Sequence, residues 1–82
     1  MWIMTQNRQR IVNADNVTSI FIDKTGTKLY ANETSTDDNI LLAEYADRST
    51  CVHVIGDLLD RLNSHETFIR MPLGGEVDKW LD

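Results

Sequence analysis

One segment of this chain has the periodicity of an α-helix, and this feature restricts the fold more than any other. The segment begins at Asp47 or Ser49, either of which is a good N-cap, and ends at about Asn63. Apolar residues recur within it at steps of three and four, namely Cys51, Val52, Ile55, Leu58, Leu59 and Leu62. The sequence therefore predicts one amphipathic helix in a chain that otherwise consists of strands and turns.

Short segments rich in β-branched, aromatic and aliphatic residues make up most of the remaining chain. The predicted strands are residues 2–5, 11–12, 17–23, 29–31, 40–45 and 67–71. Asp23 to Thr27 joins two of them in a hairpin through a type I turn, with Gly26 in the left-handed conformation. Residues 17–23 carry apolar side chains on both faces, which favours a central strand. The predicted fold class is α+β: an antiparallel sheet of about five strands with one amphipathic helix packed on one face, followed by a last strand.

A chain of 82 residues is too short for two separate hydrophobic cores, so residues 1–72 are predicted to form a single domain. Pro72 ends the last strand because it cannot donate to a strand ladder, and two glycines follow it at positions 74 and 75. Residues 73–82 are therefore a C-terminal tail, which is either a docked turn or flexible.

Two local features carry further expectations. The stretch 32–38 is wholly polar and predicts a long exposed loop. Gly56 lies inside the predicted helix, where glycine costs about 1 kcal/mol relative to alanine. A packing reason is therefore expected at Gly56, such as a close approach of the sheet.

The charge of the chain is distributed unevenly. The formal net charge is -5, with +2 in residues 1–28 and -7 in residues 29–82. This acidity disfavours nucleic acid as a partner of the C-terminal two-thirds and would steer a basic protein there. The alternative is that the carboxylates only keep a small protein soluble.

Targeting and redox signals point to the cytoplasm and to no membrane partner. No apolar run approaches the roughly 18 residues needed to cross a bilayer, and the segment from Met1 to Thr5 is too short and uncharged for a signal peptide. Cys51 is the only cysteine, which excludes an intramolecular disulfide and every zinc motif built on paired cysteines.

The turn from Asp23 to Thr27 has a second interpretation. Asp-Lys-Thr-Gly-Thr after an apolar strand is similar to the phosphorylation loop of P-type ATPases and of the wider haloacid dehalogenase superfamily. That resemblance implies that Asp23 would attack a phosphoryl group. The other motifs of the superfamily are absent from the sequence, and the fold requires a parallel doubly wound sheet. We therefore expect a structural hairpin turn and keep a phosphotransfer enzyme as a third hypothesis.

The other residues that could act in catalysis or bind a metal are not placed where they could act together. Cys51 and His53 are two positions apart, so on a helix their side chains point about 200° from each other and cannot form a nucleophile and base pair. Cys51 is expected to be a buried small apolar residue. His53 and His65 with scattered carboxylates do not define a metal site. The sequence predicts no catalytic, cofactor-binding or metal-binding residue, and no cofactor.

Surface residues are the more promising candidates. Trp2 and Trp80 lie near the two ends of the chain and are the aromatic residues least expected to be buried, so together they would form a contact patch. The predicted interaction surface combines these two rings with acidic side chains: Trp2, Asp37, Asp38, Asp57, Asp60 and Trp80.

Over residues 3–72 the chain resembles a group of small uncharacterised proteins from Gram-positive bacteria and their phages. The similar segments are Ile3 to Asn7, Ile11 to Val17 with Ile20 and Ile22, Leu42 to Tyr45, and Phe68 to Pro72. The resemblance implies a compact sheet-plus-helix fold and no catalytic residues. The loop 32–38 and the tail after Pro72 depart from it.

These observations lead to three hypotheses about function. The favoured one is a non-enzymatic protein-interaction module of phage or prophage origin, which uses its acidic surface and loops to bind a protein. The alternative is a homo-oligomeric structural or assembly component with sheet edges or Trp2 and Trp80 at the contact. The third is the phosphotransfer enzyme that uses Asp23.

Overall fold

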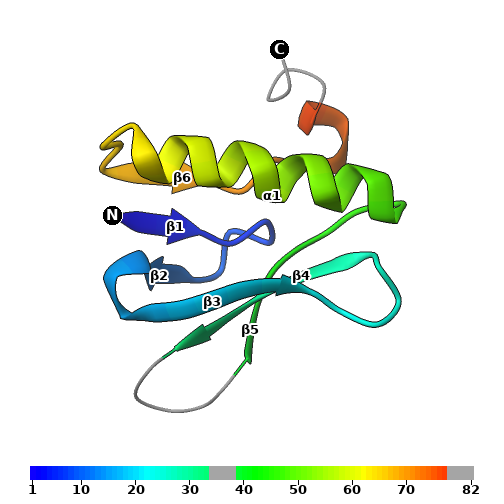
Figure 1. The fold of residues 1–82 in the computed structure, drawn as a ribbon, viewed down its shortest axis with the longest axis horizontal. Coiled ribbons are helices and arrows are strands. Elements are labelled where there is room, and N and C mark those ends of the chain that lie inside the picture. Colours follow the sequence, from blue (N-terminus) through cyan, green and yellow to red (C-terminus); the bar gives the residue numbers. More distant parts are fainter. Residues whose placement is uncertain (34–38, 78–82) are drawn as a thin grey trace.

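The computed structural model describes residues 1–33 and 39–77 (Figure 1). In chain order the elements are β1 (Trp2–Met4), β2 (Ile11–Asn13), the 3-10 helix η1 (Ala14–Asn16), β3 (Val17–Ile22), β4 (Lys28–Glu33), β5 (Asn39–Glu44), α1 (Arg48–Asn63), β6 (Phe68–Arg70) and the 3-10 helix η2 (Gly74–Glu76). The α+β class and the amphipathic helix are as predicted.

The strands form two sheets of three strands each rather than a single sheet. Sheet A has the order β2-β1-β6, and sheet B has the order β3-β4-β5. Sheet B is an antiparallel meander that contains the predicted β3–β4 hairpin. The prediction of a wholly antiparallel sheet does not hold in sheet A, where β1 pairs with β6 in parallel. The parallel pair arises because the chain crosses back through α1 before it reaches β6, a connection that tight turns cannot make.

Helix α1 starts as its sequence predicts. Of the two candidate N-caps, Asp47 is the one used, and its side chain accepts a hydrogen bond from the Thr50 N–H at 2.8 Å. Cys51, Val54 and Leu58 are its buried residues.

The core lies between the helix and the inner faces of both sheets. Sheet A contributes Ile3, Val12 and Ile69, which are cross-strand neighbours. Sheet B contributes Leu29, Ala31, Ile40, Leu42 and Ala43. Because side chains alternate along a strand, the opposite face of each sheet carries the intervening residues, and several of these are exposed and apolar.

The chain after β6 is docked as far as residue 77. Gly74–Glu76 form η2, and Val77 is buried against the core. Of the two expectations for the tail, the docked turn therefore holds for this part, while residues 78–82 with Trp80 lie outside the described residues. The predicted loop 32–38 is partly replaced by β4, which extends to Glu33, and its remainder is likewise outside the described residues.

The structural predictions made for Gly26 and Gly56 have different outcomes. Gly26 has a φ of +82°, which confirms the left-handed turn position. The expected close approach of the sheet at Gly56 is wrong, because no atom lies within 4 Å of the position that a Cβ would take there.

In the described part of the chain, no helix is long and apolar enough to cross a membrane.

Candidate functional site

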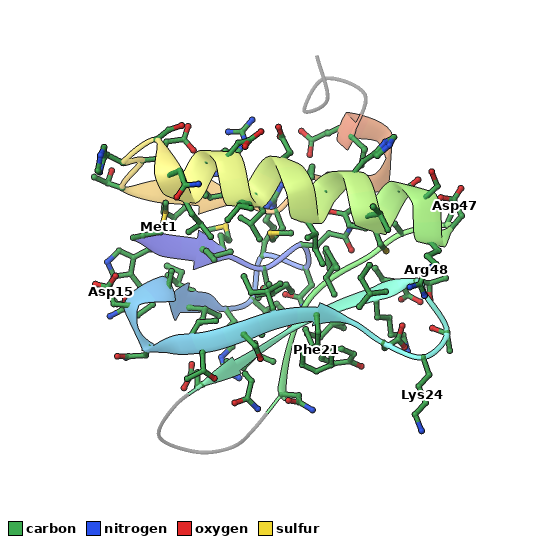
Figure 2. All side chains as sticks on the ribbon, viewed as in Figure 1. Met1, Asp15, Phe21, Lys24, Asp47 and Arg48 are labelled. Atoms are coloured by element: carbon green, nitrogen blue, oxygen red, sulfur yellow. The ribbon has the colours of Figure 1, made fainter. Side chains whose placement is uncertain are left out.

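An apolar groove with a volume of about 310 Å³ lies between α1 and β3. It is lined by Ala14, Val17, Thr18, Ser19, Ile20, Ile55, Leu58, Leu59 and Leu62. None of these side chains carries a charge. The strand β3 runs alongside α1 in the opposite direction, with Asp15 near the start of β3 and Arg48 near its far end (Figures 1 and 2).

The groove follows the first four residues of β3, at the outer edge of sheet B. Four consecutive residues of the strand, Val17 to Ile20, line it, although neighbouring strand residues direct their side chains to opposite faces. A bulge at Thr18 separates the pairs Val17–Glu33 and Ser19–Asn32. Val17 and Ile20 also pack against the core, so the groove lies where the inner face of β3 meets the outer edge of the sheet.

That edge is open in the described residues, because β3 is the outer strand of sheet B. The prediction of a central strand for residues 17–23 is therefore wrong. The apolar side chains on its two faces have different environments: Ile20 and Ile22 pack against the core, whereas Phe21 lies on the outer face and stacks on Tyr30 at 5.8 Å.

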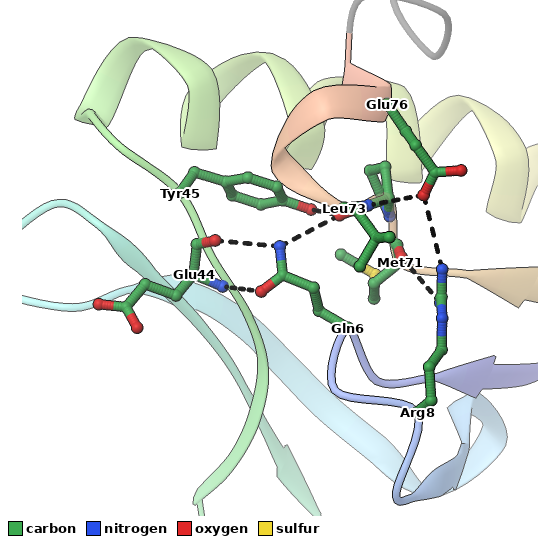
Figure 3. A network of polar contacts seen from close by, with 8 residues as sticks. Gln6, Arg8, Glu44, Tyr45, Met71, Leu73 and Glu76 are labelled. Atoms are coloured by element: carbon green, nitrogen blue, oxygen red, sulfur yellow. Dashed lines mark hydrogen bonds and ion pairs between the residues drawn. The ribbon is translucent and has the colours of Figure 1, made fainter.

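The opposite edge of sheet B is covered by Gln6 (Figure 3). The Gln6 N–H donates to the Leu42 carbonyl at 2.7 Å. The Gln6 side-chain amide pairs with the main chain of Glu44 in both directions, each bond being 3.0 Å long. The two edges of the sheet therefore differ: on β5 the loop after β1 bonds backbone groups of Leu42 and Glu44, and on β3 the edge lies beside the groove.

The helix supplies the second wall of the groove. Leu58 and Leu62 lie on its core side, whereas Leu59 is 57% exposed at the rim, the largest exposure among the large apolar residues of the described chain. Val52, one turn before Ile55, is also exposed, and Gly56, which lies between Val52 and Leu59 in sequence, has open space beside it. The sequence placed Val52 and Leu59 in the buried stripe, but the buried face of α1 is centred on Val54 and Leu58 instead.

The two ends of the groove differ in character. At the end of β3, the hairpin turn packs on the helix so tightly that a Cβ at Gly26 would lie 3.2 Å from the Cβ of Arg48. At the start of β3, Asp15 lies between the lining residues Ala14 and Val17 in sequence, and its carboxylate takes part in no ion pair among the described residues. The hairpin turn therefore contacts the helix beyond the Ile20 end of the groove, and an exposed carboxylate lies next to Ala14 at the other end.

The turn from Asp23 to Thr27 is the hairpin that the sequence predicted. Asp23 Oδ1 accepts hydrogen bonds from the backbone N–H groups of Gly26 and Lys28, both at 3.1 Å, and the Thr25 hydroxyl donates to the same carboxylate at 2.8 Å. Partial desolvation raises the pKa of Asp23, but the hydrogen bonds from Thr25, Lys28, Gly26 and Thr27 together hold it below its ordinary value. The carboxylate thus stabilises the turn; its use in phosphotransfer stays a prediction.

Cys51 is fully buried in α1, as predicted. Burial raises the pKa of its thiol, and the nearby carboxylates of Asp23 and Asp47 raise it further. The thiolate is therefore disfavoured, and Cys51 packs as a small apolar residue. Within residues 1–33 and 39–77, no group of three or more His, Cys, Asp or Glu side chains is placed to hold a metal ion.

A second polar cluster holds the end of the chain in place (Figure 3). The Tyr45 hydroxyl donates to the Pro72 carbonyl at 2.8 Å, and Arg8 donates to the Met71 carbonyl at 3.0 Å while facing Glu76 at 3.6 Å. Desolvation raises the pKa of the Tyr45 hydroxyl well above its ordinary value, so it remains a donor. Since these side chains are committed to main-chain groups of the tail, we assign the cluster a structural role.

The structure does not gather the predicted interaction residues in one place. Trp2 is 49% exposed on the outer face of sheet A. Asp57 forms an ion pair with Arg61 at 3.3 Å, and Asp60 is exposed on the helix about 100° away from Leu59. Asp37, Asp38 and Trp80 lie outside the described residues.

Trp2 has apolar neighbours that the sequence did not single out. In the register of sheet A it lies beside Phe68, and Met4 lies beside Ile11, all on the face opposite to the core. Trp2, Ile11 and Phe68 are exposed, and the Arg70 guanidinium lies 5.8 Å from the centre of the Phe68 ring. These side chains form a second apolar surface, called here the outer face of sheet A.

The groove was missed from sequence, although one signal for it exists. Residues 17–22 read Val-Thr-Ser-Ile-Phe-Ile, a strand without charge or proline, which lacks the features that usually protect an edge strand from pairing.

Comparison with protein-family models, with curated proteins and with solved structures finds no match to this chain.

Proposed function

We propose that this protein is a non-enzymatic protein-interaction module and that its binding site is the groove between α1 and β3. The observation that carries the proposal is an uncharged apolar groove placed directly beside the open edge of a strand. Both features are unfavourable in water and both are removed when another polypeptide covers them.

The lining favours a macromolecular partner over a small molecule. Sites for small ligands combine an apolar pocket with a few convergent polar groups that orient the ligand. Here the lining side chains are aliphatic apart from Thr18 and Ser19, and the groove volume of about 310 Å³ lies at the lower end of the usual range. Leu59 projects at the rim, as an anchoring contact in a protein interface would.

The test compares the proteins recovered from a host lysate by three forms of the chain. Leu59→Asp places a charge on the groove rim, and Leu73→Asp is the matched control because Leu73 is 45% exposed and does not line the groove. We expect a partner that is retained by the wild type and by Leu73→Asp and is lost with Leu59→Asp, while all three forms unfold at similar urea concentrations. Equal recovery by all three forms would contradict the proposal.

We further place this module in the cytoplasm of a Gram-positive host and in a phage or prophage genome. The support is the resemblance of residues 3–72 to small proteins of that origin and the single cysteine of the chain. Genes for phage structural or defence-related proteins beside its own gene are the expected neighbourhood, and a setting among conserved metabolic genes would contradict the assignment.

A second candidate function is self-association, which the outer face of sheet A favours. Trp2 and Phe68 are cross-strand neighbours, Ile11 lies beside Met4 on the same face, and Trp2, Ile11 and Phe68 are exposed, which makes an apolar patch suited to an isologous contact. Sedimentation equilibrium is expected to show a dimer for the wild type and a monomer for Phe68→Lys. A monomeric wild type at high concentration would eliminate this candidate and leave the groove proposal untouched.

A further inference from the structure

We infer that the partner enters the groove as an extended segment that pairs with β3 and becomes a fourth strand of sheet B. The segment is apolar at alternate positions and carries a basic residue at the end that lies near Asp15. This inference rests on the proposed function, because it specifies the kind of partner that the same groove accepts.

The hydrogen bonds of the hairpin identify the backbone groups that such a segment would meet. The Asp23 N–H donates to the Lys28 carbonyl at 3.0 Å, so Asp23 directs its backbone toward β4. In an antiparallel pair, alternate residues point their N–H and C=O groups to the same side. The backbone groups of Phe21 therefore point toward β4, and those of Ile20 and Ile22 point to the open edge beside the groove.

The covered edge of the same sheet shows how such groups are satisfied in this protein. On β5, outward-facing backbone groups of Leu42 and Glu44 are bonded by the main chain and the side chain of Gln6. The equivalent groups on β3 have no strand beside them in the described part of the chain. An added strand would supply hydrogen-bond partners for the backbone groups of Ile20 and Ile22, as Gln6 does for Leu42 and Glu44 on the opposite edge of the sheet.

The walls of the groove define the side chains of the segment. A strand added to β3 would extend sheet B at its outer edge, beside the helix, so every second side chain would face the helix side of the groove, which Ile55, Leu59 and Leu62 line. Gly56 is exposed on the same side of the helix as Val52 and Leu59, and no atom lies within 4 Å of the position that a Cβ would take there. Apolar side chains at alternate positions complement this wall.

The charges in and around the groove indicate where the segment carries its basic residue. The lining is uncharged along its whole length, so a charged side chain inside the groove would be desolvated without a partner. At the end near Ala14, the exposed carboxylate of Asp15 has no ion-pair partner among the described residues and complements a lysine or arginine. The net charge of -5 favours approach of a basic segment in the same sense.

A second folded copy does not fit this groove. In each molecule α1 runs alongside β3 and stands next to its open edge (Figure 1). Pairing β3 with the β3 of another copy would bring two helices into the space of one strand. A single extended segment from another protein avoids this overlap.

The experiment uses a displayed library of random linear peptides of about twelve residues, long enough to span the six residues of β3. Peptides are selected on the wild-type protein and counter-selected on Leu59→Asp. We expect enriched sequences with alternating apolar residues and a basic residue at one end. Fluorescence anisotropy is expected to show binding weakened about tenfold or more by Leu59→Asp and unchanged by Leu73→Asp.

Backbone pairing is tested on the enriched peptide. Methylation of the alternate peptide nitrogens that face β3 is expected to weaken binding about tenfold, while methylation of the intervening ones changes it far less. Amide hydrogen exchange of Ile20 and Ile22 should slow on binding, whereas that of Phe21 is slow in both states. Asp15→Asn is expected to weaken binding about two- to threefold at low salt and to have no effect at high salt.

The outcomes separate this inference from the function on which it rests. If no linear peptide is enriched, or if methylation and the Ile20 and Ile22 exchange rates show no effect, the inference is wrong. A partner that is still lost with Leu59→Asp in the lysate comparison would then bind the groove as a folded surface, and the proposed function would stand. If the lysate comparison finds no such partner either, both are wrong.

Discussion

Gly26 and Gly56 show at the residue scale that the same amino acid is required at one position and unfavourable at another. Gly26 adopts a φ of +82° at the tip of the β3–β4 hairpin and packs against Arg48. Gly56 has ordinary helical geometry and no neighbour within 4 Å of a Cβ. The first is needed by the fold itself, whereas the second weakens the helix and gains nothing inside the monomer.

Substitution of each glycine by alanine should therefore have opposite effects. Gly26→Ala is expected to lower the free energy of unfolding by about 1–2 kcal/mol, because a side chain in the left-handed conformation is strained and crowds Arg48. Gly56→Ala is expected to raise it by about 0.5–1 kcal/mol. Urea denaturation measures both. Destabilisation by Gly56→Ala would show that Gly56 has a packing role within the monomer.

Local sequence chemistry predicted the left-handed Gly26, an N-cap at Asp47 or Ser49, and the burial of Cys51. The structure confirms Gly26 and Cys51 and shows that Asp47 is the N-cap that is used. Each depends on interactions within a few residues or on a strong solvation preference. Gly56 was misjudged because its environment depends on what stands beside the helix, which no neighbouring residue in the sequence indicates.

At the scale of elements, α1 and β3 face each other across the groove. The apolar stripe of α1 predicted the helix and most of its buried face, but it spans too wide an arc for every member to be covered. Leu58 and Leu59 are adjacent in sequence and about 100° apart on the helix, and only Leu58 reaches the core.

This difference predicts unequal effects of the same substitution. Leu58→Ala is expected to lower the free energy of unfolding by about 2–5 kcal/mol, because Leu58 is 2% exposed and its removal leaves a cavity. Leu59→Ala is expected to change it by less than about 0.5 kcal/mol. Thermal and urea unfolding of the two variants measure this. A large loss for Leu59→Ala would mean that Leu59 supports the fold and is not available to a partner.

At the scale of the whole molecule, Gln6 connects parts that are far apart in sequence. Its side chain and main chain bond to β5, and its amide also donates to the Pro72 carbonyl at 3.2 Å. The loop after β1 therefore joins sheet A, sheet B and the start of the tail. No motif in the sequence indicated this role, because a lone glutamine in a polar loop has no local signature.

Loss of the Gln6 side chain should affect the global stability. Gln6→Ala is expected to lower the free energy of unfolding by about 1–3 kcal/mol and to speed amide exchange at Glu44, since main-chain groups of β5 lose their partner. Gln9→Ala in the same loop is the control, because the Gln9 side chain is exposed and makes no hydrogen bond among the described residues. Equal effects of the two variants would contradict the assigned role.

By itself the sequence determined the elements of this protein: one capped amphipathic helix, a hairpin with a left-handed glycine, and short strands around them. These follow from backbone preferences and from periodicities that act within ten or so residues. The tertiary structure decided that the strands divide into two sheets, that β3 is an outer strand and that Leu59 faces a groove. Pairing and exposure depend on contacts between residues distant along the chain, and an apolar strand has the same sequence pattern whether its edge is paired or open.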